Sequence, residues 1–75
     1  MEEQIKKIIA DALGVDVTVI TQELGINDIP EWNSMGNMAI IAALEENLEV
    51  EIPLEDLFEL TNVETIVEEI KNLRK

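Results

Sequence analysis

Apolar residues recur at spacings of three and four near both ends of this 75-residue chain, and this spacing limits the fold more than any other feature. Near the start, the series runs through Ile5, Ile8, Ile9, Ala12 and Leu13. Near the end, it runs through Val63, Ile66, Val67, Ile70 and Leu73. A stripe with this period lies on one face of an α-helix. A chain this short can bury only a thin shared core, so we expect a single domain over residues 1–75.

The residues that flank these two stripes indicate where the helices begin and end. Glu2 and Glu3 suit the positive end of the first helix, and Gly14 is placed to stop it. Thr61 and Glu64 have the spacing of a capping box at the start of the last helix.

The middle of the chain predicts one further main helix and one short one. We expect a helix over about 34–48 with Asn33 or Ser34 as its cap, and a short helix in "EVEIPLEDLFEL" with Pro53 at its first position. The segment before residue 34 contains "VDVTVI", which alternates like a strand but has no second strand to pair with. We interpret that segment as a long loop held to the bundle by Val15, Val17, Ile20, Leu24 and Ile29.

The prediction is therefore an all-α bundle of three main helices plus one short helix, with a long loop between helices one and two. No stretch approaches the roughly 18 apolar residues of a membrane span. The first residues, "MEEQIKK", are polar and charged, unlike a secretory signal. We expect a cytoplasmic protein.

The charge and the missing residue types exclude several functions. The net charge is −12, and all five basic residues lie near the ends, at Lys6, Lys7, Lys71, Arg74 and Lys75. Such a field repels nucleic acid and anionic membranes and favours basic protein surfaces, although it would also serve simply to keep a monomer soluble. Without cysteine or histidine the chain cannot assemble a thiolate site or the commonest general base, so we expect no metal site and no enzyme activity.

The expected second helix is apolar on two faces, which is unusual for a helix in so small a bundle. Ile40, Ile41, Leu44 and Leu48 share one face, which we assign to the core. The second face must stay partly exposed, and exposed apolar strips usually mark interaction surfaces. We therefore predict a docking surface made of methionines, a small residue and two acids: Met35, Met38, Ala42, Glu45 and Glu46.

Ser34 stands at the head of this helix, between its two faces. Two interpretations are open from periodicity alone. Ser34 either caps the helix while the methionines fill the core, or it presents a hydroxyl for attachment at the end of a docking surface.

An ordered set of motifs resembles the acyl carrier proteins and related phosphopantetheine-bearing domains. These motifs are "NSM" where the family has Asp-Ser-Leu or Asp-Ser-Met, then "ALEENL", "VEIPLEDL" and "LTNVETIVEEI". The resemblance implies that Ser34 receives 4′-phosphopantetheine from coenzyme A through a magnesium-dependent transferase, with Trp32, Asn33 and Met35 as signature neighbours. The thiol of the arm then carries an acyl or aminoacyl group as a thioester for partner enzymes with basic docking surfaces, in a lipid or specialised biosynthetic pathway.

The resemblance also implies a space for the acyl chain between the second and third helices. We expect it to be lined by Ile40, Ile41, Leu44, Ile52, Leu57, Leu60 and Ile66.

The chain departs from the family pattern at several positions. Asn33 replaces the usual aspartate, which puts the efficiency of modification in doubt, and Gly36 and Ala39 replace acids typical of fatty-acid carriers. Trp32 is either a mark of stand-alone carriers of specialised pathways or an aromatic anchor for the loop. The alternatives are an unprimed carrier-like interaction module and an acidic cation-binding bundle, although no calcium-loop pattern is present.

Overall fold

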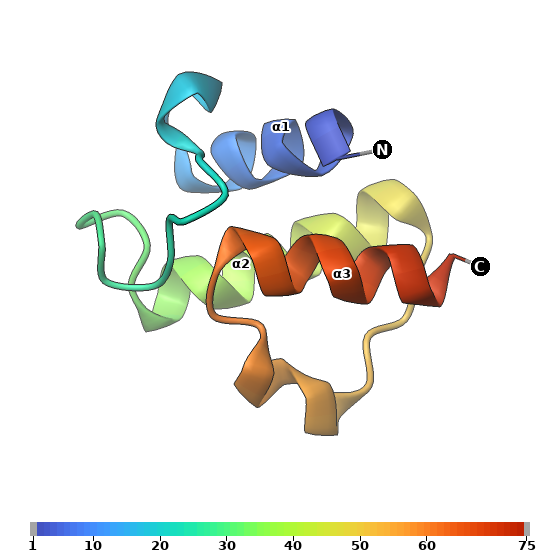
Figure 1. Cartoon of the computed structure of the whole chain (residues 1–75). Helices are drawn as coiled ribbons and strands as arrows, with labels where there is room; N and C mark the ends of the chain where they lie inside the picture. The colour runs from blue at the N-terminus through green and yellow to red at the C-terminus, as the bar shows by residue number, and fades with distance from the viewer. Residues whose placement is uncertain (1, 75) are drawn as a thin grey trace.

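The computed structural model describes residues 2–74 and folds them into three α-helices and two short 3₁₀ helices (Figure 1). In chain order these are α1 (Glu2–Leu13), η1 (Val17–Val19), α2 (Ser34–Leu48), η2 (Leu54–Glu59) and α3 (Val63–Leu73). Within residues 2–74 the only β-type pairing is an isolated antiparallel bridge between Gly25 and Asn62. The expected all-α bundle is confirmed, with its long connection before α2 and its short helix at η2.

Two helix ends follow from backbone conformation. α1 ends at Gly14, whose φ of +72° lies in the left-handed region that glycine tolerates best. α2 ends at Glu49, also left-handed with φ of +53°, and the guanidinium of Arg74 donates a hydrogen bond to the Leu48 carbonyl at 3.3 Å. A basic group there complements the negative end of the helix.

Two of the expected helix starts are wrong by one residue. The cap of α3 is Asn62, whose side-chain oxygen accepts a hydrogen bond from the backbone N–H of Thr65 at 2.8 Å. Thr61 lies before the helix because its carbonyl accepts from the Ile26 N–H at 2.7 Å and so belongs to the loop pairing. Pro53 likewise precedes η2 and does not occupy its first helical position.

The core gathers the apolar faces of all three α-helices around one centre. The expected core face of α2 is confirmed, because Ile40, Ile41, Leu44 and Leu48 are all buried. The other buried apolar side chains are Ile5, Ile8, Ile9, Ala10, Ile20, Trp32, Ile52, Leu60, Val63, Ile66, Val67 and Ile70. Val17 was expected to hold the loop to the bundle, and this is wrong: it is 45% exposed on η1, which contributes no buried residue.

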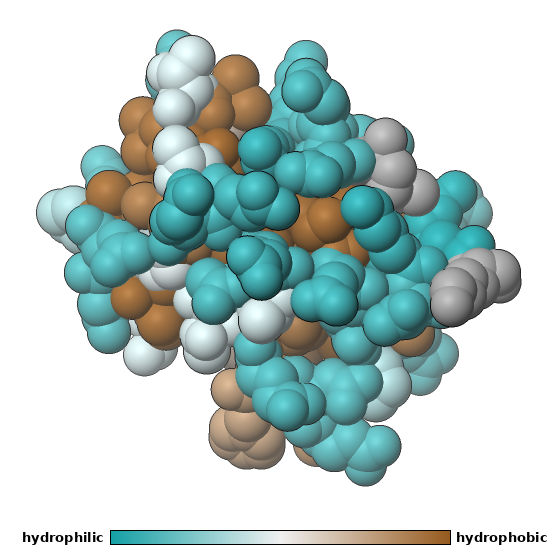
Figure 2. Space-filling view, in the orientation of Figure 1, coloured by the Kyte–Doolittle hydropathy of each residue, from teal (hydrophilic) through white to brown (hydrophobic). Residues whose placement is uncertain are grey.

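The loop before α2 is tied to the start of α3 by backbone hydrogen bonds. In addition to the bond between Ile26 and Thr61, the Val63 N–H donates to the Leu24 carbonyl at 2.9 Å. η2 is held less firmly, because none of its residues is buried. Figure 2 shows a largely hydrophilic face, with apolar groups protruding at the lower edge where η2 lies in Figure 1. None of the helices in the described part of the chain has the length and apolarity that a membrane crossing requires.

Candidate functional site

The head of α2 presents Ser34 as the first residue of the helix, and Asn33 is its cap. The side-chain oxygen of Asn33 accepts a hydrogen bond from the Gly36 N–H at 2.8 Å, and its carbonyl accepts from the Asn37 N–H at 2.8 Å. Ser34 is exposed, and its hydroxyl forms no hydrogen bond to any described residue. Of the two interpretations of Ser34, capping is therefore excluded, and the hydroxyl is left free at the positive end of α2.

Trp32 fixes the loop that leads into this helix. Its side chain is fully buried, and the indole Nε1–H donates to Oδ1 of Asn37 at 2.9 Å. Its carbonyl accepts a hydrogen bond from the Asn27 N–H at 2.6 Å, which closes the turn before it. Trp32 is thus an anchor for the end of the loop and sets the position from which Ser34 projects.

Gly36 allows the loop to pass close to the first turn of α2. A Cβ at this position would overlap the carbonyl oxygen of Glu31 and would lie 3.0 Å from Cδ2 of Leu13. The glycine at position 36 is therefore required by the close approach of the backbone beside Ser34.

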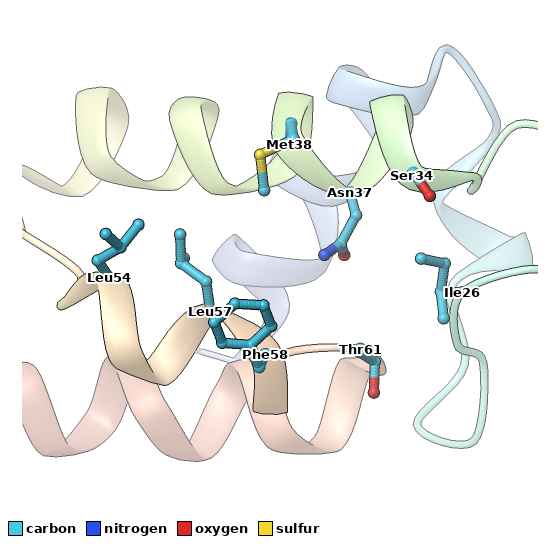
Figure 3. Close-up of a pocket in the computed structure, with 8 residues that line it drawn as sticks. All are labelled: Ile26, Ser34, Asn37, Met38, Leu54, Leu57, Phe58 and Thr61. Atoms are coloured by element: carbon cyan, nitrogen blue, oxygen red, sulfur yellow. The ribbon is translucent and has the colours of Figure 1, made fainter.

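A pocket of about 470 Å³ opens next to Ser34, between α2 and η2 (Figure 3). Most of its lining is apolar, and it comes from the loop before α2, from α2, from η2 and from the segment between η2 and α3. The lining residues are Ile26, Ser34, Asn37, Met38, Leu54, Leu57, Phe58 and Thr61. A free hydroxyl at the edge of an apolar pocket suits a group that is attached outside and folds its apolar part inward.

The pocket differs in composition from the acyl cavity expected from the sequence. Of the seven residues expected to line it, only Leu57 does so, while Ile40, Ile41, Leu44, Ile52, Leu60 and Ile66 are buried in the core. The sequence reasoning did not identify Ile26, Asn37, Leu54, Phe58 or Thr61 as lining residues. The signals available were the position of Asn37 one helical turn after Ser34 and the four-residue spacing of Leu54 and Phe58.

The expected docking surface lies on the outside of α2. Met35 is 82% exposed, and Met38, Ala42 and Glu46 are also exposed. Glu45 differs from these residues, because it is half-buried and its carboxylate accepts a hydrogen bond from the Ile52 N–H at 3.0 Å. Glu45 therefore also has a structural role, which is to hold the segment that leads into η2.

Two carboxyl groups of η2, those of Asp56 and Glu59, lie near the carboxyl group of Glu69 on α3. The pKa of Glu69 on α3 is raised from its ordinary value by a hydrogen bond with Asp56, by partial desolvation and by the charges of Asp56 and Glu59. At η1, hydrogen bonds from the backbone and side chain of Thr18 lower the pKa of Asp16. Despite this acidity, the described residues contain no group of three or more potential metal ligands placed to hold an ion.

Among residues 2–74, no side chain forms a hydrogen bond with the Ser34 hydroxyl that would activate it as a nucleophile. The chain also contains no histidine, the commonest general base.

Comparison with known proteins agrees with this geometry. The family model described as "Phosphopantetheine attachment site" matches residues 3–70. The chain is 34% identical over 73 residues to a protein of Campylobacter lari named acyl carrier protein, covering 97% of this chain and 95% of that protein. It also resembles the solution NMR structure of holo acyl carrier protein from Geobacter metallireducens, with a TM-score of 0.84, 26% identity, and coverage of 96% of this chain and 83% of that one.

Proposed function

The chain belongs to the family of acyl carrier proteins, and from that premise we propose that Ser34 is the residue that bears its 4′-phosphopantetheine arm. Members of this family carry substrates and do not catalyse reactions themselves. The observation that carries the proposal is the free, exposed hydroxyl of Ser34 at the head of α2, beside the pocket. Ser34 is also the only serine in the chain.

The residues around Ser34 fit the arm in two ways. The first backbone N–H groups of an α-helix have no partners within the helix, and together with the helix dipole they favour an anion such as the phosphodiester. The apolar wall of the pocket, formed by side chains such as Leu54, Leu57 and Phe58, suits methylene groups of the arm or its cargo. When bound, the arm supplies the thiol on which an acyl group is held as a thioester.

Asn33 is compatible with this function. Its side-chain oxygen makes the capping hydrogen bond to Gly36 that an aspartate would make. What asparagine lacks is the negative charge beside the hydroxyl. We therefore propose that Asn33 slows modification by the transferase without changing the modified residue, and that Asn33→Asp speeds it.

Partner enzymes approach the exposed side of α2 in this proposal. Met35, Met38 and Ala42 supply apolar contact, and Glu46, with the unbonded part of the Glu45 carboxylate, attracts basic groups of the partner. The partners are a phosphopantetheinyl transferase and enzymes that load or transfer acyl or aminoacyl groups in a lipid or specialised biosynthetic pathway. The strong negative charge of the chain supports a monomer that avoids nucleic acid.

The test is modification of the purified chain by coenzyme A, magnesium and a broad-specificity phosphopantetheinyl transferase, followed by intact-protein mass spectrometry. The wild type should gain the mass of one arm, and Ser34→Ala should gain none. Thr61→Val is the matched control, because Thr61 lines the same pocket and its loss should leave modification intact. An arm on the Ser34→Ala variant would refute the assignment, and no arm on the wild type would favour an unprimed interaction module.

A further inference from the structure

Asn37 is a buried polar residue inside the otherwise mainly apolar pocket beside Ser34. It is only 7% exposed, and it is the only polar residue among residues 2–74 that is buried. It lies three residues after Ser34, which places it one helical turn further along α2 and at an axial distance of roughly 4.5 Å. A buried side-chain amide needs hydrogen-bond partners for both its oxygen and its nitrogen.

The Trp32 contact determines which way the Asn37 amide faces. An indole N–H is a donor and has no acceptor capacity, so the atom that faces it must be the amide oxygen. The oxygen Oδ1 of Asn37 is thus held by Trp32 at 2.9 Å. The amide nitrogen Nδ2 must then point away from Trp32, and Figure 3 shows the end of the Asn37 side chain directed into the space between α2 and η2.

Nδ2 of Asn37 has no hydrogen-bond partner among the described residues, whereas Oδ1 has one. Every fully buried side-chain nitrogen or oxygen in residues 2–74 has a hydrogen-bond partner. Because Nδ2 has none, it is not fully buried, and it keeps a surface that is open to the pocket. Of the other polar lining groups, Thr61 turns its hydroxyl away from α2 in Figure 3. Once an arm is attached, the Ser34 oxygen is part of a phosphoester and has no proton to donate in a hydrogen bond. The pocket therefore offers a fixed donor, the Asn37 amide, among apolar walls.

We propose that Asn37 is a binding and specificity residue of the pocket, whose Nδ2–H donates a hydrogen bond to a carbonyl oxygen of the attached arm or of its acyl cargo. This inference rests on the proposed attachment at Ser34. A carbonyl group suits this position because it accepts a hydrogen bond and has no donor of its own to satisfy. The methylene groups next to the carbonyl can contact Met38, Leu57 and Phe58. A purely alkyl segment at the same place would leave Nδ2 covered and unpaired, which costs free energy.

The experiment uses ¹H–¹⁵N spectra of the whole chain in four forms: unmodified, carrying the arm alone, carrying hexanoyl on the arm, and carrying 3-oxohexanoyl on the arm. Asn37→Asp serves to assign the Asn37 side-chain resonances, which it removes. It keeps an oxygen for Trp32 while replacing the pocket-facing donor with an acceptor. Mass spectrometry confirms the modification of each sample. Asn47→Asp is the matched control, because it makes the same change at an exposed position of α2 that does not line the pocket.

We expect the Asn37 amide protons to move downfield on modification and to exchange with solvent roughly fivefold more slowly, as for one neutral hydrogen bond. A response to the arm alone assigns the acceptor to an amide carbonyl of the arm. A response in both acylated forms but not with the arm alone assigns the acceptor to the thioester carbonyl. A response with 3-oxohexanoyl alone assigns it to the oxo group. The modification that shifts the Asn37 amide should also raise the melting temperature of the wild type. Asn37→Asp should lose this gain, and Asn47→Asp should keep it.

A fully modified chain in which no form changes the Asn37 amide would overturn the inference and leave Asn37 solely as the partner of Trp32. That result would leave the proposed function intact. Absence of any arm on Ser34 would overturn the proposed function and this inference with it. If Asn37→Asp fails to fold, triple-resonance spectra of the wild type assign the Asn37 amide instead, and the wild-type forms still decide the question.

Discussion

Replacing Gly36 with alanine tests whether the loop before α2 is as closely packed as the structure shows. By helix propensity alone, Gly36→Ala should stabilise α2 by up to about 1 kcal/mol. The new Cβ would overlap the Glu31 carbonyl oxygen and come within 3.0 Å of Leu13 Cδ2. The overlapped atom belongs to the backbone, which must move by about 1 Å to restore a normal contact.

The two effects have opposite signs, and we expect the steric cost to exceed the gain. Inserting an extra group into a packed site typically costs about 1–3 kcal/mol. After the propensity gain is subtracted, Gly36→Ala should lower the free energy of unfolding by about 1 kcal/mol and the melting temperature by about 4–8 °C. The rate of Ser34 modification should fall as well, because the displaced segment contains the cap of α2.

The assay is urea unfolding followed by the fluorescence of Trp32, the only tryptophan, with Asn47→Ala as the control substitution on α2. Asn47 is exposed, and its side chain bonds only to the Ala43 carbonyl of the same helix. This control should gain slightly in stability from alanine's propensity. If Gly36→Ala also gains stability, the close approach of Glu31 to α2 is not a feature of the protein in solution.

Three further substitutions test the charges and the exposed apolar groups. Glu46→Lys should slow association with the transferase roughly threefold or more at low salt, and less at high salt, in stopped-flow measurements; an unchanged rate would remove Glu46 from the docking surface. The raised pKa of Glu69 means that its protonated form stabilises the fold below about pH 4.5, and this contribution is lost as the pH rises. Glu69→Gln should therefore raise the melting temperature slightly at pH 7 and by less at pH 4, and an equal effect at both would show that Asp56 does not act on it. Phe58→Ser should change the free energy of unfolding by less than about 0.5 kcal/mol, since Phe58 is 86% exposed, and a large loss in a thermal melt would place its ring in the core.

The helices could be predicted from the sequence because their signals are local. The stripes that begin at Ile5 and Val63 repeat with the period of the helix, and Gly14 stops the first of them. The cap of α3 was misplaced because Thr61 and Asn62 are both good caps. The choice between them depends on Ile26, which is distant in sequence and engages the Thr61 carbonyl.

The pocket could not be predicted in detail because distant segments form it. Ile26 and Phe58 lie 32 residues apart and meet at the pocket only in the folded chain. Branched residues such as Ile40 were expected to line this space, whereas the structure buries them in the core and they do not line the pocket. Asn37 was missed because an asparagine in a helix usually points to solvent, and only its contact with Trp32 gives it a buried position.

The weak attachment of η2 determines how fast the wall of the pocket can move. η2 buries no side chain of its own and is held at one end by the bond between Glu45 and the Ile52 N–H, and at the other by the buried Leu60. Elements with so few buried contacts open by local fluctuation, on timescales of nanoseconds to microseconds for loops and up to milliseconds for larger segments. Enzymes commonly turn over about ten times per second. Opening of η2 on these timescales would be fast relative to turnover, so a cargo held in the pocket as proposed would not have to wait for this wall to move.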